Sequence, residues 1–380
     1  MTKTVPPADY QQMLVRLQES APLLSHLHLN ADVPPYDPTI ISAMSNAICT
    51  FKHLVSVRTG PLPITEQAFR YLAELPHLEV INVRLPDTIT EASFRRAPFD
   101  EIFPSLRELR LAHLFNLNLI SLIVQHTRSP RLEIISAESV DEDRPVPLED
   151  VMSFFSAILS RNNAEHIKEL TIEALPIEWT PQNTFTNQHL EPLFALKSLT
   201  TLKLHLRCTF DLDDVILERT ARAWPNIRTL DLGPGSTGVR VPSLAALIPF
   251  AQHCPELQVL GFTLDADLCR VPPDIRDSAR DYAQRELRVL KVGCAEVADP
   301  RCVAAFLADL FPHLRDIECG SIDANGMEIG AAAEWDWEEV CEEHLPAAAR
   351  ERGIVFEPTL DEIDARVMKA WYIGRRTSEQ

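Results

Sequence analysis

The sequence predicts a single α/β solenoid, built from repeats that each pair a short strand with a helix. Three observations predict it. An apolar phrase of the form Leu-x-x-Leu-x-Leu returns eleven times, its copies begin about 29 residues apart on average, and a proline often stands two residues before it. The chain has 380 residues, of which 46% are hydrophobic and 24% charged, values typical of a folded globular protein.

Each copy of the phrase predicts one strand, because the closing Leu-x-Leu alternates with a period of two and so buries one face. The clearest copies are Pro76–Val83, Pro104–Leu111, Pro130–Ile135, Pro225–Leu232, Pro255–Phe262 and Pro312–Cys319. Weaker copies begin at Leu24, Leu54, Ile167, Leu199 and Leu287.

Helical patterns precede most of the strands, at residues 10–20, 64–75, 148–159, 213–224, 243–253 and 299–311. The proline between helix and strand ends the helix, because its ring clashes with the preceding turn and it has no N–H group. One such unit cannot bury both of its apolar faces alone. Stacked units can, with parallel strands on the concave side and helices on the convex side.

Two features modify this leucine-rich-repeat pattern. Regular repeats carry an Asn or Cys whose side chain forms a hydrogen-bonded ladder between repeats. Here those positions hold unrelated residues such as Asp32, Leu62 and Ile322, and the loss of the ladder predicts irregular repeats. The repeats end near Cys319. We therefore expect a solenoid over residues 8–320, a C-terminal capping segment over 321–358 with an amphipathic helix at 334–345 and a last strand at 353–356, and an acidic and polar tail over 359–380.

Charge and cysteine usage narrow the class of protein. The 36 basic and 55 acidic residues give a net charge of −19, which disfavours nucleic acid as a partner. No apolar run approaches the ~20 residues of a membrane span, and the N-terminus lacks the features of a signal peptide. The eight cysteines include no Cys-x-x-Cys pair and are read as reduced thiols, so we expect a cytoplasmic or nuclear protein without a metal centre.

The repeat phrases resemble the leucine-rich-repeat half of the F-box proteins of mushroom-forming fungi. The resemblance is carried by the period of about 29 residues, by Phe103–Leu111 and Trp224–Leu232, and by the closing run from Trp337 to Pro346. It implies that the repeats hold a substrate for ubiquitination, while an F-box before them docks on Skp1. The nearest string to an F-box opening, Leu175–Glu178, lies between two repeats, so binding to Skp1 is expected only if an F-box exists upstream.

One loop offers an enzymatic alternative. Gly233–Gly238 matches the dinucleotide fingerprint Gly-x-Gly-x-x-Gly between a strand and a helix. Every unit of a strand–helix solenoid supplies that context, and the helix begins late, near Pro242, so the loop reads better as a structural turn. No His-Glu-x-x-His, Gly-x-Ser-x-Gly or Walker motif is present, and we expect no enzyme, no cofactor and no metal.

The concave face holds the candidate binding residues. The residues between and just after the last two apolar positions of each phrase point away from the core, and they include Arg58, Arg84, Arg110, Lys203 and His205. Neighbouring parallel strands lie about 4.8 Å apart, so we expect the three arginines to form one strip. Such a strip fits an acidic or phosphorylated protein partner. The chain is therefore predicted to be a protein-interaction module, with a scaffold unrelated to ubiquitin as the alternative.

Overall fold

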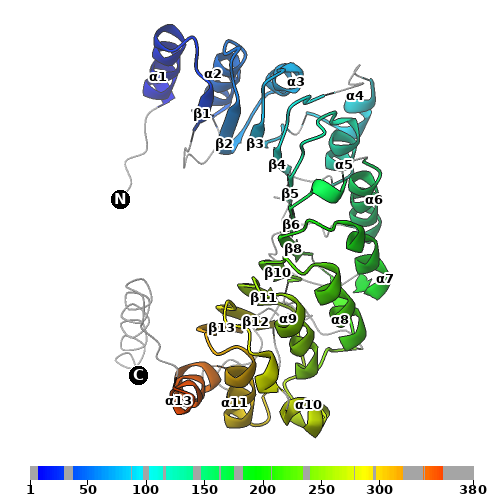
Figure 1. Ribbon diagram of the computed structural model, residues 1–380. Helices are drawn as coiled ribbons and strands as arrows, with labels where there is room; N and C mark the ends of the chain where they lie inside the picture. The colour runs from blue at the N-terminus through cyan, green and yellow to red at the C-terminus, as the bar shows by residue number, and fades with distance from the viewer. Residues whose placement is uncertain are drawn as a thin grey trace, which may run out of the picture.

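The computed structural model describes residues 7–29, 37–86, 88–96, 102–113, 117–139, 147–161, 164–174, 183–206, 208–233, 240–277, 279–293, 297–319, 337 and 339–353. The chain forms an arc in which strands line the inner side and helices cover the outer side (Figure 1). The predicted α/β leucine-rich-repeat solenoid is confirmed.

Eleven parallel strands form one sheet, in the order β1-β2-β3-β4-β5-β6-β8-β10-β11-β12-β13. Each of the eleven predicted phrases supplies one of them. The strands are β1 His26–His28, β2 Ser56–Pro63, β3 Val80–Arg84, β4 Glu108–His113, β5 Ile134–Ser139, β6 Glu169–Ala174, β8 Thr201–His205, β10 Thr229–Asp231, β11 Val259–Gly261, β12 Val289–Gly293 and β13 Asp316–Cys319. A second, two-stranded sheet pairs β7 (Thr184–Thr186) with β9 (Thr209–Asp211).

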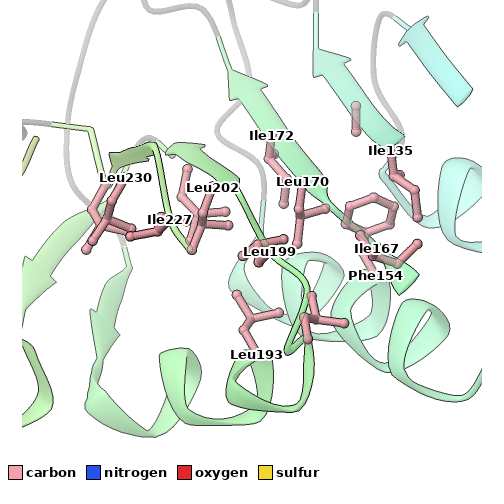
Figure 2. Packing of buried hydrophobic residues seen from close by; sticks show 14 of the residues in the cluster. Ile135, Phe154, Ile167, Leu170, Ile172, Leu193, Leu199, Leu202, Ile227 and Leu230 are labelled. Atoms are coloured by element: carbon pink, nitrogen blue, oxygen red, sulfur yellow. The ribbon is translucent and has the colours of Figure 1, made fainter. Parts of the chain in front are cut away.

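The register aligns the apolar positions of successive repeats. Leu170 pairs with Leu202, and Leu202 pairs in turn with Leu230. All three are fully buried, and Figure 2 shows them in one row with Phe154 of the flanking helix packed behind. Because every strand contributes to this row, the core is continuous from one end of the arc to the other.

Helices on the convex side begin and end close to the predicted positions. Residues 148–159 form α6 with the predicted bounds, whereas 243–253 divide into a 3₁₀ turn at Leu244–Leu247 followed by α9. The α-helices are α1 Pro7–Ser20, α2 Pro38–Ile48, α3 Glu66–Glu74, α4 Glu91–Arg96, α5 Leu117–His126, α6 Leu148–Leu159, α7 Asn187–Leu190, α8 Asp214–Ala223, α9 Ile248–His253, α10 Pro273–Asp277, α11 Pro300–Leu310 and α13 Leu345–Glu351.

Side-chain caps fix several helix starts. Asp213 accepts a hydrogen bond from the N–H of Ile216 at 3.0 Å, and Asp299 accepts one from the N–H of Cys302 at 3.0 Å. These bonds satisfy backbone donors that a helix leaves unpaired in its first turn. The sequence therefore sets where α8 and α11 begin.

A backbone ladder runs beside the strands. The carbonyl of Arg107 accepts from the N–H groups of Glu133 and Ile134, at 2.9 and 3.0 Å. The residue after the first Leu of each phrase makes the same paired contact with the next repeat, from Ser25 to Arg288. Main-chain groups thus link neighbouring repeats where the Asn ladder of regular repeats is missing, since each buried carbonyl finds its partners.

The C-terminal helix differs from the prediction. It was expected to end at Leu345, but it continues through Pro346 to Glu351. A π-helical turn at Val340–His344 precedes the proline, with the Leu345 N–H bonded to the Val340 carbonyl, and this wide turn accommodates a ring that an α-helix interior would reject. The predicted strand at 353–356 and the tail lie almost wholly outside the described residues.

This helix packs on the last repeat. Trp337 and Val340 are fully buried, and Arg352 pairs with Asp309 of α11 at 2.5 Å. Asp309 also binds Arg280 at 2.8 Å. The described part of 321–358 therefore covers the end of the core, and the boundaries predicted for the capping segment remain predictions.

Candidate functional site on the concave face

Three rows of side chains cross the inner face of the sheet, because strands in register place equivalent residues side by side. We name them by their order along each strand. The first row includes Val80, Glu108, Ile134, Glu169 and Thr201; the middle row includes Arg58, Asn82, Arg110, Ser136, Thr171, Lys203, Asp231, Gly261, Lys291 and Glu318; the last row includes Arg84, Ala112, Glu138, Glu173 and His205.

The three predicted arginines do not share one row. Arg58 and Arg110 lie in the middle row with Asn82 between them. Arg84 lies in the last row, in register with Ala112 and then Glu138. The expected strip is therefore staggered, and the arginines lie on two levels of the same face.

Carboxylates neutralise two of these arginines. Arg58 lies 3.0 Å from Glu108, and Arg110 donates through Nε to Glu108 at 2.7 Å and through Nη2 to Glu169 at 3.2 Å. The four side chains form the N-terminal network, which carries no net charge. The sequence prediction missed Glu108 and Glu169 because it considered only positions after the first apolar residue of each strand, and both stand just before it.

A second network lies on the C-terminal half of the face. Asp231 is only 2% exposed, with His205 Nε2 at 3.0 Å and Lys291 Nζ at 3.2 Å from its Oδ2. Lys291 also reaches Glu318 at 2.9 Å, and the Gly233 N–H donates to Asp231 Oδ1 at 3.1 Å. Burial would raise the pKa of Asp231, but His205, Lys291 and the Gly233 N–H outweigh it and lower that pKa to about 2. We call these residues the C-terminal network.

Two glycines make room for it. A β carbon at Gly261, on the strand between Asp231 and Lys291, would lie 2.9 Å from Asp231 Oδ1 and 3.3 Å from Lys291 Cβ. Gly233 has φ +60°, and a β carbon there would lie 2.9 Å from the Leu204 carbonyl oxygen. Both positions require glycine for steric reasons, so the buried carboxylate depends on them.

The centre of the concave face, unlike the two networks beside it, holds charged side chains that are not paired with one another. Glu138 on β5, Glu173 on β6 and Lys203 on β8 form no ion pair or hydrogen bond among the residues that the structure describes. Glu138 and Glu173 are direct neighbours in register. Burial and the adjacent Glu173 raise the pKa of Glu138, and the more distant Arg84 opposes the shift. We call Glu138, Glu173 and Lys203 the central patch.

The glycine-rich loop does not form a phosphate cradle in its described part. The N–H of Gly233 is directed to a carboxylate, that of Asp231, and residues 234–239 lie outside the described part. The Ser243 N–H and hydroxyl, which open the following 3₁₀ turn, bind Asp214 at 2.7 Å each. Acidic side chains thus occupy the described backbone donors on both sides of the loop, and the dinucleotide alternative itself falls on residues outside the described part.

The described residues offer neither a metal site nor a membrane-spanning helix. The described residues contain no cluster of three or more His, Cys, Asp or Glu side chains able to hold a metal ion. None of the described helices combines the length and the apolar character that crossing a membrane requires. Cys208 and Cys254 are buried thiols whose pKa values burial raises to about 12, which makes them poor nucleophiles.

The fold and its polar inner face are those of a leucine-rich-repeat solenoid. No protein-family model matches the chain, and no curated protein matches it. Among solved structures, the chain is similar to the crystal structure of the Rad7 and Elc1 complex in yeast, with 14% sequence identity and a TM-score of 0.41 over 82% of this chain and 83% of that one. A likeness of this degree carries no argument about function.

Proposed function

We propose that the chain is a protein-interaction module that holds its partner on the concave face. The observation that carries the proposal is the inner face of the eleven-stranded sheet, whose middle row is polar or charged from Arg58 to Glu318 except at Gly261. A solenoid presents such a face as an extended surface that is already shaped before binding. The finer role, substrate recognition for an F-box-type ubiquitin ligase, is supported by the resemblance of the repeat phrases.

The test is site-specific photo-crosslinking in the cells that naturally make the protein. A photoreactive phenylalanine analogue is placed at Ser136 or Thr229 on the concave face, and at Val215, which is 64% exposed on α8, as the convex control. We expect one protein to crosslink from the concave positions and not from Val215. Crosslinks from Val215 alone would contradict the proposal.

The ubiquitin role has a separate test. Residues 1–380 are mixed with purified Skp1, and the complex is sought by size-exclusion chromatography. We expect no complex, because the sequence offers no F-box motif for Skp1 to bind. If the crosslinked partner is also not ubiquitinated in those cells, the scaffold alternative replaces the ligase adaptor.

A further inference from the structure

We infer that the central patch is the docking point for a protein segment that presents a basic side chain to Glu138 and Glu173 and an acidic side chain to Lys203. This inference rests on the proposed function and adds the chemistry of the partner. It differs from the sequence prediction, in which the partner was acidic or phosphorylated and lay on the arginines.

The distribution of paired charges carries the argument. On one side of the patch, Arg58 and Arg110 bind Glu108 and Glu169 within the N-terminal network. On the other side, Asp231 and Glu318 bind Lys291, and Asp231 also binds His205, within the C-terminal network. A partner that used either network would first have to displace an ion pair that the protein already makes.

Of these three regions, only the patch has carboxylates without an ion pair among the described residues. Glu138 and Glu173 are half-buried on adjacent strands, and like charges directly opposite one another destabilise a sheet. Arg84, two strands from Glu138, and His205, in register with Glu173, face the patch from either side without forming an ion pair with it. An arginine or lysine placed between the two glutamates would offset that repulsion, and the planar arginine fork suits two carboxylates. Lys203 supplies a charge of the opposite sign, so the patch favours a segment with both signs of charge over a purely basic one.

The spacing restricts the segment further. Glu173 and Lys203 lie on neighbouring strands and two residues apart along them, which separates their β carbons by roughly 7–8 Å. Residues two apart in an extended chain lie about 6.5 Å apart, and the β carbons of residues four apart on a helix about 5–6 Å apart, so long side chains on either can reach both groups. The basic and acidic residues of the partner should therefore stand two to four positions apart.

The experiment selects ligands without assuming a partner. A random twelve-residue peptide library displayed on phage is panned against the full chain, and the enriched peptides are synthesised for anisotropy titrations. We expect enriched peptides to carry a basic and an acidic residue two to four positions apart. Their affinity should fall at least tenfold in the double variant E138Q/E173Q.

Matched controls separate the patch from the overall charge of −19. Glu19 and Glu165 are exposed and far from the inner face, so E19Q/E165Q changes the net charge equally and should leave binding unchanged. Lys203→Met should weaken binding, and Lys52→Met, at an exposed turn, should not. In E138K/E173K, a peptide whose basic residue is replaced by glutamate should regain affinity.

The outcomes distinguish the inference from the proposed function. Peptides that bind E138Q/E173Q normally but lose affinity for Asn82→Trp or Thr229→Trp would place the partner elsewhere on the concave face, so the inference would fail and the proposed function would stand. Peptides that no concave substitution affects would overturn both. A selection that yields no binder from repeated panning would count against both as well.

Discussion

The two halves of the inner face hold their charges in different ways. In the N-terminal half, Glu108 is 9% exposed, and the side chains of the two arginines that bind it are 31–37% exposed. In the C-terminal half, the acid of the network is Asp231, whose side chain is buried against the sheet and only 2% exposed. The difference arises from Gly261, which leaves the space above one strand empty and lets Asp231 and Lys291 meet across it. Both networks thus bury one acid beneath partly exposed cations, but Asp231, in the middle row, lies deeper than Glu108, in the first row.

The strongest perturbation tests the core that both halves share. Leu230→Asp places a charge at a fully buried position between Leu202 and Leu260, which costs several kcal/mol. Because neighbouring repeats stabilise one another, we expect several repeats to unfold together. Circular dichroism during thermal unfolding measures this. Thr229→Asp, one residue away on the concave face, is the control and should be tolerated better; equal loss in both variants would contradict the assigned register.

A substitution in the C-terminal network should cause the next largest loss of stability. Asp231→Asn removes the charge that His205 and Lys291 share, and breaking a buried pair costs about 3–5 kcal/mol. Urea unfolding at pH 7 gives the difference in free energy of unfolding between the variant and the native chain.

The same network predicts a pH dependence. The pKa of Asp231 is lowered from 3.8 to about 2 in the folded chain, so its ionised form contributes stability above pH 4 that is lost as the pH falls through about 2. That shift corresponds to about 2 kcal/mol. The difference between the native chain and Asp231→Asn should therefore shrink between pH 5 and pH 2, and a constant difference would show that the charge is not responsible.

A substitution in the N-terminal network should lower stability less. Glu108→Gln leaves Arg58 without its carboxylate partner and removes one of the two that Arg110 has. Both arginines are 31–37% exposed, so water partly replaces the lost carboxylate, and we expect a cost of about 1 kcal/mol. Urea unfolding of this variant beside Asp231→Asn provides the direct comparison. If Glu108→Gln lowered the free energy of unfolding more than Asp231→Asn does, the expected order of the two networks would be wrong.

The central patch should give the smallest effect and the opposite sign. Burial and Glu173 raise the pKa of Glu138, so its ionised form destabilises the fold, and this penalty grows as the pH rises through the raised pKa. Glu138→Gln should therefore stabilise the free protein at pH 7 by about 0.2–1 kcal/mol. Differential scanning calorimetry at pH 7 and pH 4 tests this, since the gain should diminish at the lower pH.

The fold was predictable because its signal is local and repeated. Buried leucines recur at a fixed phase, so all eleven strands of the large sheet could be placed, and the helical pattern over residues 148–159 predicted both ends of α6. The continuation of the last helix through Pro346 was not predicted, because the proline rule assumes α-helical geometry and the chain forms a π turn there.

The charges of the inner face were harder to predict. Which arginine meets which acid depends on the register between strands. Arg84 stands two residues further along its phrase than Arg58 and Arg110 do along theirs, so the register places it in another row. The role of Gly261 could not be predicted either, because the side chains for which it makes room, Asp231 and Lys291, lie 30 residues away in each direction along the sequence. Whether Arg58, Arg84, Arg110, Lys203 and His205 bind a partner remains a prediction.

The parallel ladder has a mechanical consequence. Hydrogen bonds between strands point along the arc, so tension applied to its two ends would load the bonds of successive repeats in series. Neighbouring strands would then separate one pair at a time, and they would not slide past one another along their length. The strength of each link is set by the number of paired residues: β10 shares three pairs with β8 and three with β11, and β1 and β2 also share three, whereas β4 and β5 share six. Under load, the repeats should separate first at such three-pair links and later between β4 and β5.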